Sequence, residues 1–173
     1  MKISEDLLAQ FNDQITLEFS ASTVYRQLAI SAESDDLPGM AQWLRRQADE
    51  EIVHANKFID HVLARDAVPQ IGAVAAPNPL KDAEPLEIFE AALAHEQKVS
   101  ESIRNLYRAC DEAGDLDSRP LLMWFVDEQL EEESTVSEII GRLKRIGDNG
   151  QGILQLDAEL GKRPEGGTEP VGE

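Results

Sequence analysis

The chain has 173 residues, of which 42% are hydrophobic and 29% charged, a composition typical of one folded domain rather than a disordered chain. Asp and Glu number 34 against 16 Lys and Arg, a formal net charge of −18, which excludes a general nucleic-acid binder and disfavours docking on anionic membranes. The same charge favours cationic ligands, metal ions above all.

The single cysteine, Cys110, excludes an intrachain disulfide framework and fits a reducing compartment. The N-terminal residues lack the apolar core of a signal peptide. No run approaches the roughly 18 apolar residues that a membrane span requires. We therefore expect a cytoplasmic protein.

The sequence predicts four long helices, over residues 4–33, 38–65, 85–113 and 117–146, and a short fifth helix near 150–160. Ser4 is a suitable N-cap for the first helix, and Pro38 suits the first turn of the second. Gly114 and Gly147 are placed to end the third and fourth helices.

The connections between these helices predict the topology. The first and third connections are short, so each joins antiparallel neighbours. The connection over 66–84 reaches about 60 Å when extended, more than the roughly 42 Å length of the preceding helix. We expect an all-α four-helix bundle with one long crossover between the second and third helices. It forms one domain over residues 1–160, followed by a flexible tail over 161–173.

Each long helix carries an apolar stripe at alternating spacings of three and four residues, and each stripe contains a glutamate near its midpoint. These glutamates are Glu18, Glu51, Glu96 and Glu132. The stripe of the third helix runs through Leu86, Phe89, Leu93, Glu96, Ser100, Ile103, Tyr107 and Cys110. Because helices of similar length bring their midpoints to one level, the four carboxylates should converge inside the bundle.

Four buried carboxylates repel one another and each is costly to desolvate, so the arrangement requires compensating positive charge. Protonation could neutralise some of them, but a pair of metal ions does so better. His54, three residues after Glu51, adds a nitrogen ligand on the same face. Mixed carboxylate and imidazole ligands suit iron or manganese, with zinc as an alternative.

Several spaced motifs resemble those of the bacterial non-haem ferritins, over residues 1 to about 160. They are Glu18 with Tyr25 seven residues later, residues 50–54 (Glu-Glu-Ile-Val-His), residues 95–97 (His-Glu-Gln) and residues 124–133 (Trp-Phe-Val-Asp-Glu-Gln-Leu-Glu-Glu-Glu). The resemblance implies a ferritin-like di-iron fold, whose carboxylate ligands project into the bundle core.

The resemblance also implies roles for individual residues in a ferroxidase centre. The first iron would be bound by Glu18, Glu51 and His54. The second would be bound by Glu51, Glu96 and Glu132, with Glu51 bridging. Gln129 would sit beside the site and contact its oxygen ligands through water. Tyr25 would hydrogen-bond a ligand glutamate and supply an electron.

The function implied is iron storage and detoxification. Fe(II) would be oxidised by O2 or H2O2, and Fe(III) stored as mineral inside a cage of 24 subunits, towards which the short fifth helix would contribute an apolar face. A third iron site on the cavity side would use Glu50, Glu128 and Glu131. If it has no ligand role, this trio is simply a solvated acidic face.

The sequence departs from the ferritin pattern in places. Bacterioferritins ligate haem through a methionine after the bridging glutamate; Ile52 stands there, so we expect no haem. Their second Glu-x-x-His motif is also absent. Arg119 and Leu122 occupy the positions that are acidic in the three-fold pore of animal ferritins, so that entry route does not transfer.

Two other functions remain open on the sequence alone. One is a di-iron or di-manganese oxidoreductase that acts on peroxide or an organic substrate. The rubrerythrin form of this activity is excluded because it needs four cysteine ligands. The other is a non-catalytic shell protein, which would keep the assembly and lose the metal centre.

Overall fold

The structure, a computed structural model, describes residues 3–162, and residues 1–2 and 163–173 lie outside this part. The tail predicted over 161–173 therefore falls outside the described residues, apart from Gly161 and Lys162. The described residues form only helices and connections. The helices are α1 (Glu5–Ser34), α2 (Pro38–Leu63), α3 (Pro85–Glu112), the 3-10 helix η1 (Leu116–Ser118), α4 (Arg119–Ile146) and α5 (Gly150–Leu160). The predicted all-α fold is confirmed.

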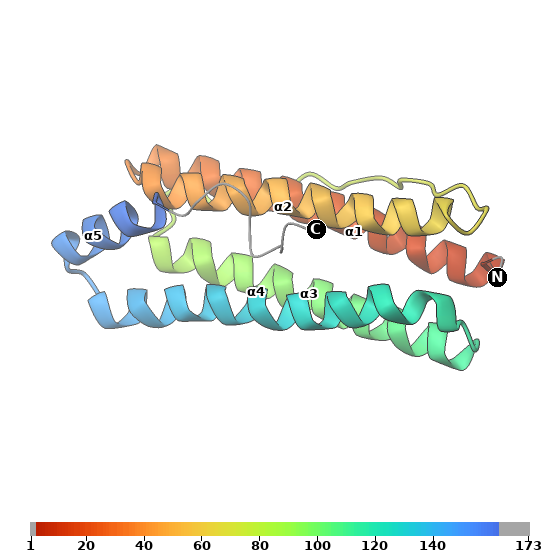
Figure 1. Ribbon diagram of the computed structural model, residues 1–173. Helices are drawn as coiled ribbons and strands as arrows, with labels where there is room; N and C mark the ends of the chain where they lie inside the picture. Colours follow the sequence, from red (N-terminus) through yellow and green to blue (C-terminus); the bar gives the residue numbers. More distant parts are fainter. Residues whose placement is uncertain (1–2, 163–173) are drawn as a thin grey trace.

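The four long helices form two antiparallel hairpins, α1 with α2 and α3 with α4, which pack side by side (Figure 1). The short helix α5 lies at one end of the bundle, against the start of α2. Among residues 3–162 the helices are either too short or too polar to traverse a lipid bilayer.

The crossover between α2 and α3 runs along α1. The amide of Gln70 donates to Asn12 Oδ1 and the amide of Gly72 to Thr16 Oγ1, both at 2.8 Å. Nearer its end, the Leu80 carbonyl accepts from Ser31 Oγ at 2.8 Å. These contacts move up α1 from its first third to its last turn, so the crossover traverses the bundle as the sequence predicts.

The helix ends follow the predicted signals with shifts of one or two residues. Ser4 Oγ accepts from the amide of Leu7 at 3.3 Å, and Pro38 begins α2. Gly114 and Gly147 take φ values of 67° and 55°, which a side chain would oppose. The fourth helix begins two residues later than predicted because η1 occupies the turn before it.

The core consists of two apolar clusters with a polar layer between them. One cluster lies towards the α5 end and includes Leu44 and Phe89. The other lies towards the N-terminus and includes Phe11 and Phe125. Between them the buried polar side chains are Glu18, Ser22, Gln47, Glu51, His54, Glu96, Ser100, Gln129 and Glu132. The apolar halves hold the four helices in register and so place this layer at the centre of the bundle.

The stripe predicted for the third helix was wrong at three of its eight positions, whereas Ser100 is buried as predicted. Leu86, Leu93 and Tyr107 are half-buried, and the fully buried side chains at these levels are Ile88, Ala92, Val99 and Leu106. Both stripes pass through Phe89, Glu96, Ile103 and Cys110, every seventh residue, so the position of Glu96 is the same in either phase.

The carboxylate of Asp157, on α5, attaches this helix to the start of α2. The Asp157 side chain, 8% exposed, accepts from the amide of Met40 at 2.7 Å, while Leu37 at the N-cap position offers no side-chain cap. A Cβ on Gly39 would lie 1.9 Å from the Asp157 carbonyl oxygen. The absence of a side chain at Gly39 is therefore what lets α5 approach closely enough for Asp157 to cap α2.

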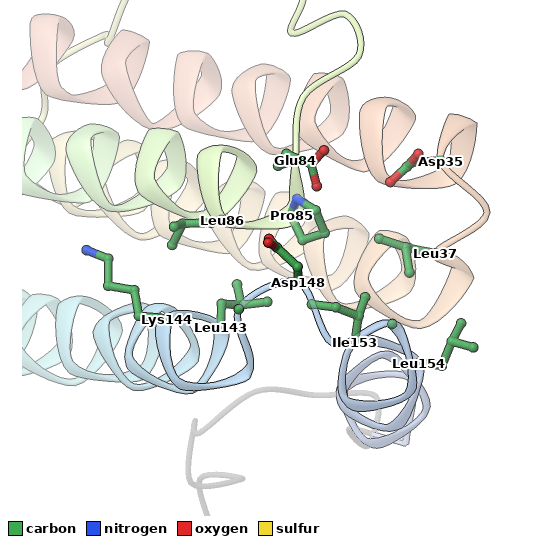
Figure 2. A pocket seen from close by; sticks show the side chains of 12 residues that line it. Asp35, Leu37, Glu84, Pro85, Leu86, Leu143, Lys144, Asp148, Ile153 and Leu154 are labelled. Atoms are coloured by element: carbon green, nitrogen blue, oxygen red, sulfur yellow. The ribbon is translucent and has the colours of Figure 1, made fainter.

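A groove of about 870 Å³ lies beside α5, where the ends of α1, α3 and α4 meet. Figure 2 shows Leu37, Leu86, Leu143, Ile153 and Leu154 around it, with Lys144 and acidic side chains at its rim. None of the four midpoint glutamates lines it, so this groove is separate from the central polar layer.

We predict that Gly39→Ala destabilises the metal-free protein by about 1–3 kcal/mol, because the methyl group must push α5 away from α2. Gly141→Ala is the matched control: Gly141 is an exposed glycine in α4, and a Cβ there meets nothing within 4 Å. This control should be neutral or stabilising by up to about 1 kcal/mol. Urea unfolding measures both, and equal stability of the two variants would contradict the close packing of α5.

Candidate metal centre

The polar layer brings together one glutamate from each long helix. Glu18, Glu51 and Glu96 have no exposed surface, and Glu132 retains 7%. His54, one turn after Glu51 on α2, is 2% exposed, and its Nδ1 lies 3.4 Å from Glu51 Oε2. The convergence predicted from the helix midpoints is therefore present.

These side chains form two groups that could each hold a metal ion. The ligand atoms of Glu18, Glu51 and His54 all lie within 4.8 Å of one another, and so do those of Glu51, Glu96 and Glu132. We call these the first and second metal positions. Because Glu51 belongs to both groups, two cations held there would be neighbours that share one carboxylate.

Three carboxylate oxygens in this layer are placed to bind a cation. Glu18 Oε2, Glu51 Oε1 and Glu96 Oε2 are buried and have no hydrogen-bond partner among residues 3–162. A buried carboxylate oxygen without a donor is costly unless a positive charge compensates it. Each group thus contains unsatisfied oxygens in the place where a divalent cation would bind.

Without a bound cation, the electrostatics of this layer favour proton uptake. Burial raises the pKa of Glu51 well above its ordinary value, and the charges of Glu96 and Glu18 raise it further. Burial also raises the pKa of Glu132, with Glu96 and Glu51 adding to the shift. The pKa of Glu18 is raised by burial too, although His54 opposes this. The protein therefore holds these carboxylates ionised only at a cost, which bound cations would remove.

Two further residues named from the sequence contact the ligands directly. The Tyr25 hydroxyl, fully buried, donates to Glu96 Oε1. Gln129 Nε2 donates to Glu132 Oε2 at 2.6 Å. Each bond fixes one carboxylate oxygen, so Tyr25 and Gln129 both orient ligands from outside the two metal groups.

The sequence did not single out several other polar neighbours. Gln47 Nε2 lies 3.5 Å from Glu132 Oε1, and Ser100 Oγ donates to Gln129 Oε1 at 2.9 Å. Gln14 Nε2 donates to Glu18 Oε1 at 2.7 Å. The position of Gln14, four residues before Glu18 on the same helix, was the signal that could have found it, whereas Gln47 contacts Glu132 on another helix.

The three glutamates predicted for a third iron site line one small pocket. This pocket, about 20 Å³, is bounded by Glu50, Glu128 and Glu131 together with Glu132, Trp43, Gln47 and Thr135. Glu50 and Glu128 are half-buried and Glu131 is exposed. A ligand atom of Glu128 also lies within 4.8 Å of His54 and Glu132, so the pocket adjoins the buried groups.

The remaining histidines and the cysteine lie outside the ligand groups found within residues 3–162. His61 Nε2 is 2.8 Å from Ser118 Oγ, and its ring packs on Phe11. Burial lowers the pKa of His95 to about 4, with the Lys98 charge contributing. Cys110 is a buried thiol in the apolar cluster, as predicted.

Comparison with known proteins identifies relatives over most of the chain. A family model described as "Ferritin: Ferritin-like domain" matches residues 8–146. The bacterial non-heme ferritin of Bacteroides fragilis is 33% identical over 93% of this chain and 99% of its own length. That of Staphylococcus aureus is 34% identical over 93% of this chain and 96% of its own.

A solved structure, an open pore ferritin from the hyperthermophilic archaeon Archaeoglobus fulgidus, superposes with a TM-score of 0.92 at 34% identity. The superposition covers 95% of this chain and 100% of that one. The ferritin-like architecture expected from the sequence motifs is confirmed.

We predict that Glu51→Gln stabilises the metal-free protein at pH 8 by on the order of 1–4 kcal/mol and flattens its pH dependence. The folded state binds a proton at Glu51 more tightly than the unfolded chain does, because its pKa is raised above the ordinary 4.5. The resulting stability is full below pH 4.5 and is lost as the pH rises through the raised pKa, a loss that glutamine avoids.

Denaturant unfolding of the chelator-treated protein at pH 5 and pH 8 measures this effect. Glu138→Gln, at an exposed position on α4, is the control and should change stability by no more than about 0.5 kcal/mol. If Glu51→Gln were less stable than wild type at pH 8, ionised Glu51 would not be destabilising the metal-free protein.

Proposed function

The chain belongs to the ferritin family, and on that premise we propose that it stores iron by oxidising Fe(II) at the buried metal centre and sequestering the Fe(III) product as mineral inside a hollow assembly. Family membership supports the iron-storage role. The ferroxidase reaction and the cage of 24 subunits are the finer parts of the proposal.

One observation carries the ferroxidase proposal: Glu51 is common to two groups of potential metal ligands. Two Fe(II) ions bound side by side can each give up one electron. The two electrons and two protons convert O2 to H2O2, or H2O2 to two water molecules. Carboxylate oxygens with one imidazole nitrogen form a donor set that suits iron.

The protein's contribution is to bind and orient both substrate ions. Glu18 and His54 would hold one ion and Glu96 and Glu132 the other, with Glu51 between them. The hydrogen bonds from Tyr25 to Glu96 and from Gln129 to Glu132 keep each carboxylate turned to one orientation. The charge of each iron ion rises from +2 to +3 on oxidation, so the negatively charged carboxylates stabilise Fe(III) more than Fe(II).

Exposed apolar side chains support the assembly part of the proposal. Leu154 on α5 is 62% exposed beside the apolar groove, and Val68 and Ile71 on the crossover are 76% and 57% exposed. A helix as short as α5 needs packing partners to be stable. In an assembly, these three apolar side chains would be buried against further copies of the chain.

The pocket lined by Glu50, Glu128 and Glu131 supports a third iron position next to the first two. Its carboxylates can accept a hard cation that leaves the buried groups. We assign it to the transfer of iron between the centre and the stored mineral.

We predict that anaerobic loading with Fe(II), followed by O2, gives rapid oxidation at two irons per chain and then continued uptake within a particle of constant mass. His54→Ala should abolish the rapid phase and leave the particle mass unchanged, because His54 is a ligand that belongs to neither apolar cluster and loses only its ring contacts with Trp124 and Phe125. Lys57→Ala, on the same helix near Trp124, is a control outside the ligand groups. Absorbance and analytical ultracentrifugation report both properties.

The outcome separates the alternatives. Rapid oxidation without mineral growth indicates the oxidoreductase on the same fold, and a particle of constant mass without oxidation indicates a non-catalytic shell. Monomers or dimers in physiological salt would contradict the cage.

We predict that replacing Glu50, Glu128 and Glu131 together by alanine leaves the first oxidation fast and changes later turnovers and the Fe(II):O2 ratio. The ligands of the first two positions remain, so only the path beyond them is altered. Stopped-flow oxidation and oxygen uptake, at two irons per chain and at several tens, test this. If the variant had wild-type kinetics at both loadings, these three glutamates would have no role in iron transfer and would be simply a solvated acidic face.

A further inference from the structure

Two side chains outside the ligand groups form a hydrogen-bonded chain that ends on Glu18. Ser102 Oγ, on α3, donates to Gln14 Oε1 at 2.6 Å. Gln14 Nε2, on α1, donates to Glu18 Oε1 at 2.7 Å. Gln14 is 1% exposed, so the middle of this chain is shielded from solvent.

The chemistry of the three groups sets the direction of the chain. An ionised carboxylate only accepts hydrogen bonds, so the amide must turn its NH2 group towards Glu18. Its carbonyl oxygen then faces α3, where the hydroxyl of Ser102 supplies the donor it needs. Ser102 thereby favours the one amide orientation that donates to Glu18.

This bond leaves Glu18 with one oxygen for the metal. Oε1 is occupied by Gln14, whereas Oε2 is buried and has no hydrogen-bond partner within the described part of the chain. Oε1 keeps a second lone pair, but turning it towards the cation would weaken the bond from Gln14, so binding through Oε2 alone is favoured. We propose that Gln14, oriented by Ser102, is a positioning residue that restricts Glu18 to one-oxygen binding at the first metal position. This inference rests on the proposed function.

The second metal position has a similar hydrogen-bonded chain, but the serine at its outer end has two acceptors. Ser100 Oγ donates to Gln129 Oε1 at 2.9 Å, and Gln129 Nε2 to Glu132 Oε2 at 2.6 Å. The Ser100 hydroxyl also lies against Glu133 Oε1, and its single proton can serve only one acceptor at a time. Glu132 also has Gln47 Nε2 3.5 Å from its other oxygen, so amides approach both oxygens of Glu132 but one oxygen of Glu18. The two positions should therefore bind metal unequally.

Ser102 can be altered without disturbing the apolar core. It is half-buried and lines a surface groove of about 330 Å³ between α1 and α3, together with Gln10, Asp13, Lys98, Glu101, Asn105 and Leu106. Removing its hydroxyl changes the amide's partner and leaves both apolar clusters intact, since neither contains Ser102.

The test is a titration of the metal-free protein with Co(II), followed by visible absorption and calorimetry. In Gln14→Met, the binding step that Glu18→Ala eliminates should weaken about 10–100-fold, as is usual when a ligand loses its orienting partner. Glu18 would then bind through both oxygens, and the higher coordination number should lower the absorbance per Co(II). Gln10→Met, one turn earlier on α1, is the matched control and should match wild type.

Ser102→Ala should shift both readouts in the same direction by a smaller amount, and Ser102→Thr should restore them because it retains the hydroxyl. Wild-type affinity and spectrum in Gln14→Met would overturn the inference while leaving the proposed function standing. A wild-type protein that bound no Co(II) pair would overturn both.

Discussion

The burial of four carboxylates at one level, away from water and close to one another, is the constraint on which the rest of the structure depends. Glu18, Glu51 and Glu96 are fully buried, and oxygens on all three lack a hydrogen-bond partner among residues 3–162. Without a cation this layer costs free energy, which the apolar packing on either side must offset. With two cations the same layer becomes a source of stability, because binding to the folded state alone shifts the folding equilibrium.

The fold serves this layer by making its surroundings rigid. The two apolar clusters hold four helices in register, and the crossover is hydrogen-bonded to α1 at Gln70, Gly72 and Leu80. At the far end, the buried pair of Arg65 and Asp115, 2.7 Å apart, links the end of α2 to the turn before α4. A site whose ligands come from four helices needs such fixed spacing, since a small shift of one helix would separate the two groups that share Glu51.

The sequence was sufficient to predict the four glutamates and His54, because helix spacing alone puts them on the buried face at matched depth. The sequence could not predict which oxygen of each carboxylate accepts a hydrogen bond from a neighbouring side chain. The bond from Ser102 to Gln14 depends on how α1 and α3 are rotated against each other. The same rotation decided the phase of the third helix, where Val99 and Leu106 are buried in place of Leu93 and Tyr107. The capping of α2 by Asp157 joins residues 117 positions apart, a separation that no local pattern reveals.

The most direct test of the account is anomalous diffraction at the iron absorption edge, from crystals loaded with Fe(II) in the absence of oxygen. The account predicts two adjacent peaks per chain in the polar layer, one contacting Glu18 and His54, the other contacting Glu96 and Glu132, and both contacting Glu51. Iron found only at exposed carboxylates, with the layer empty, would contradict it.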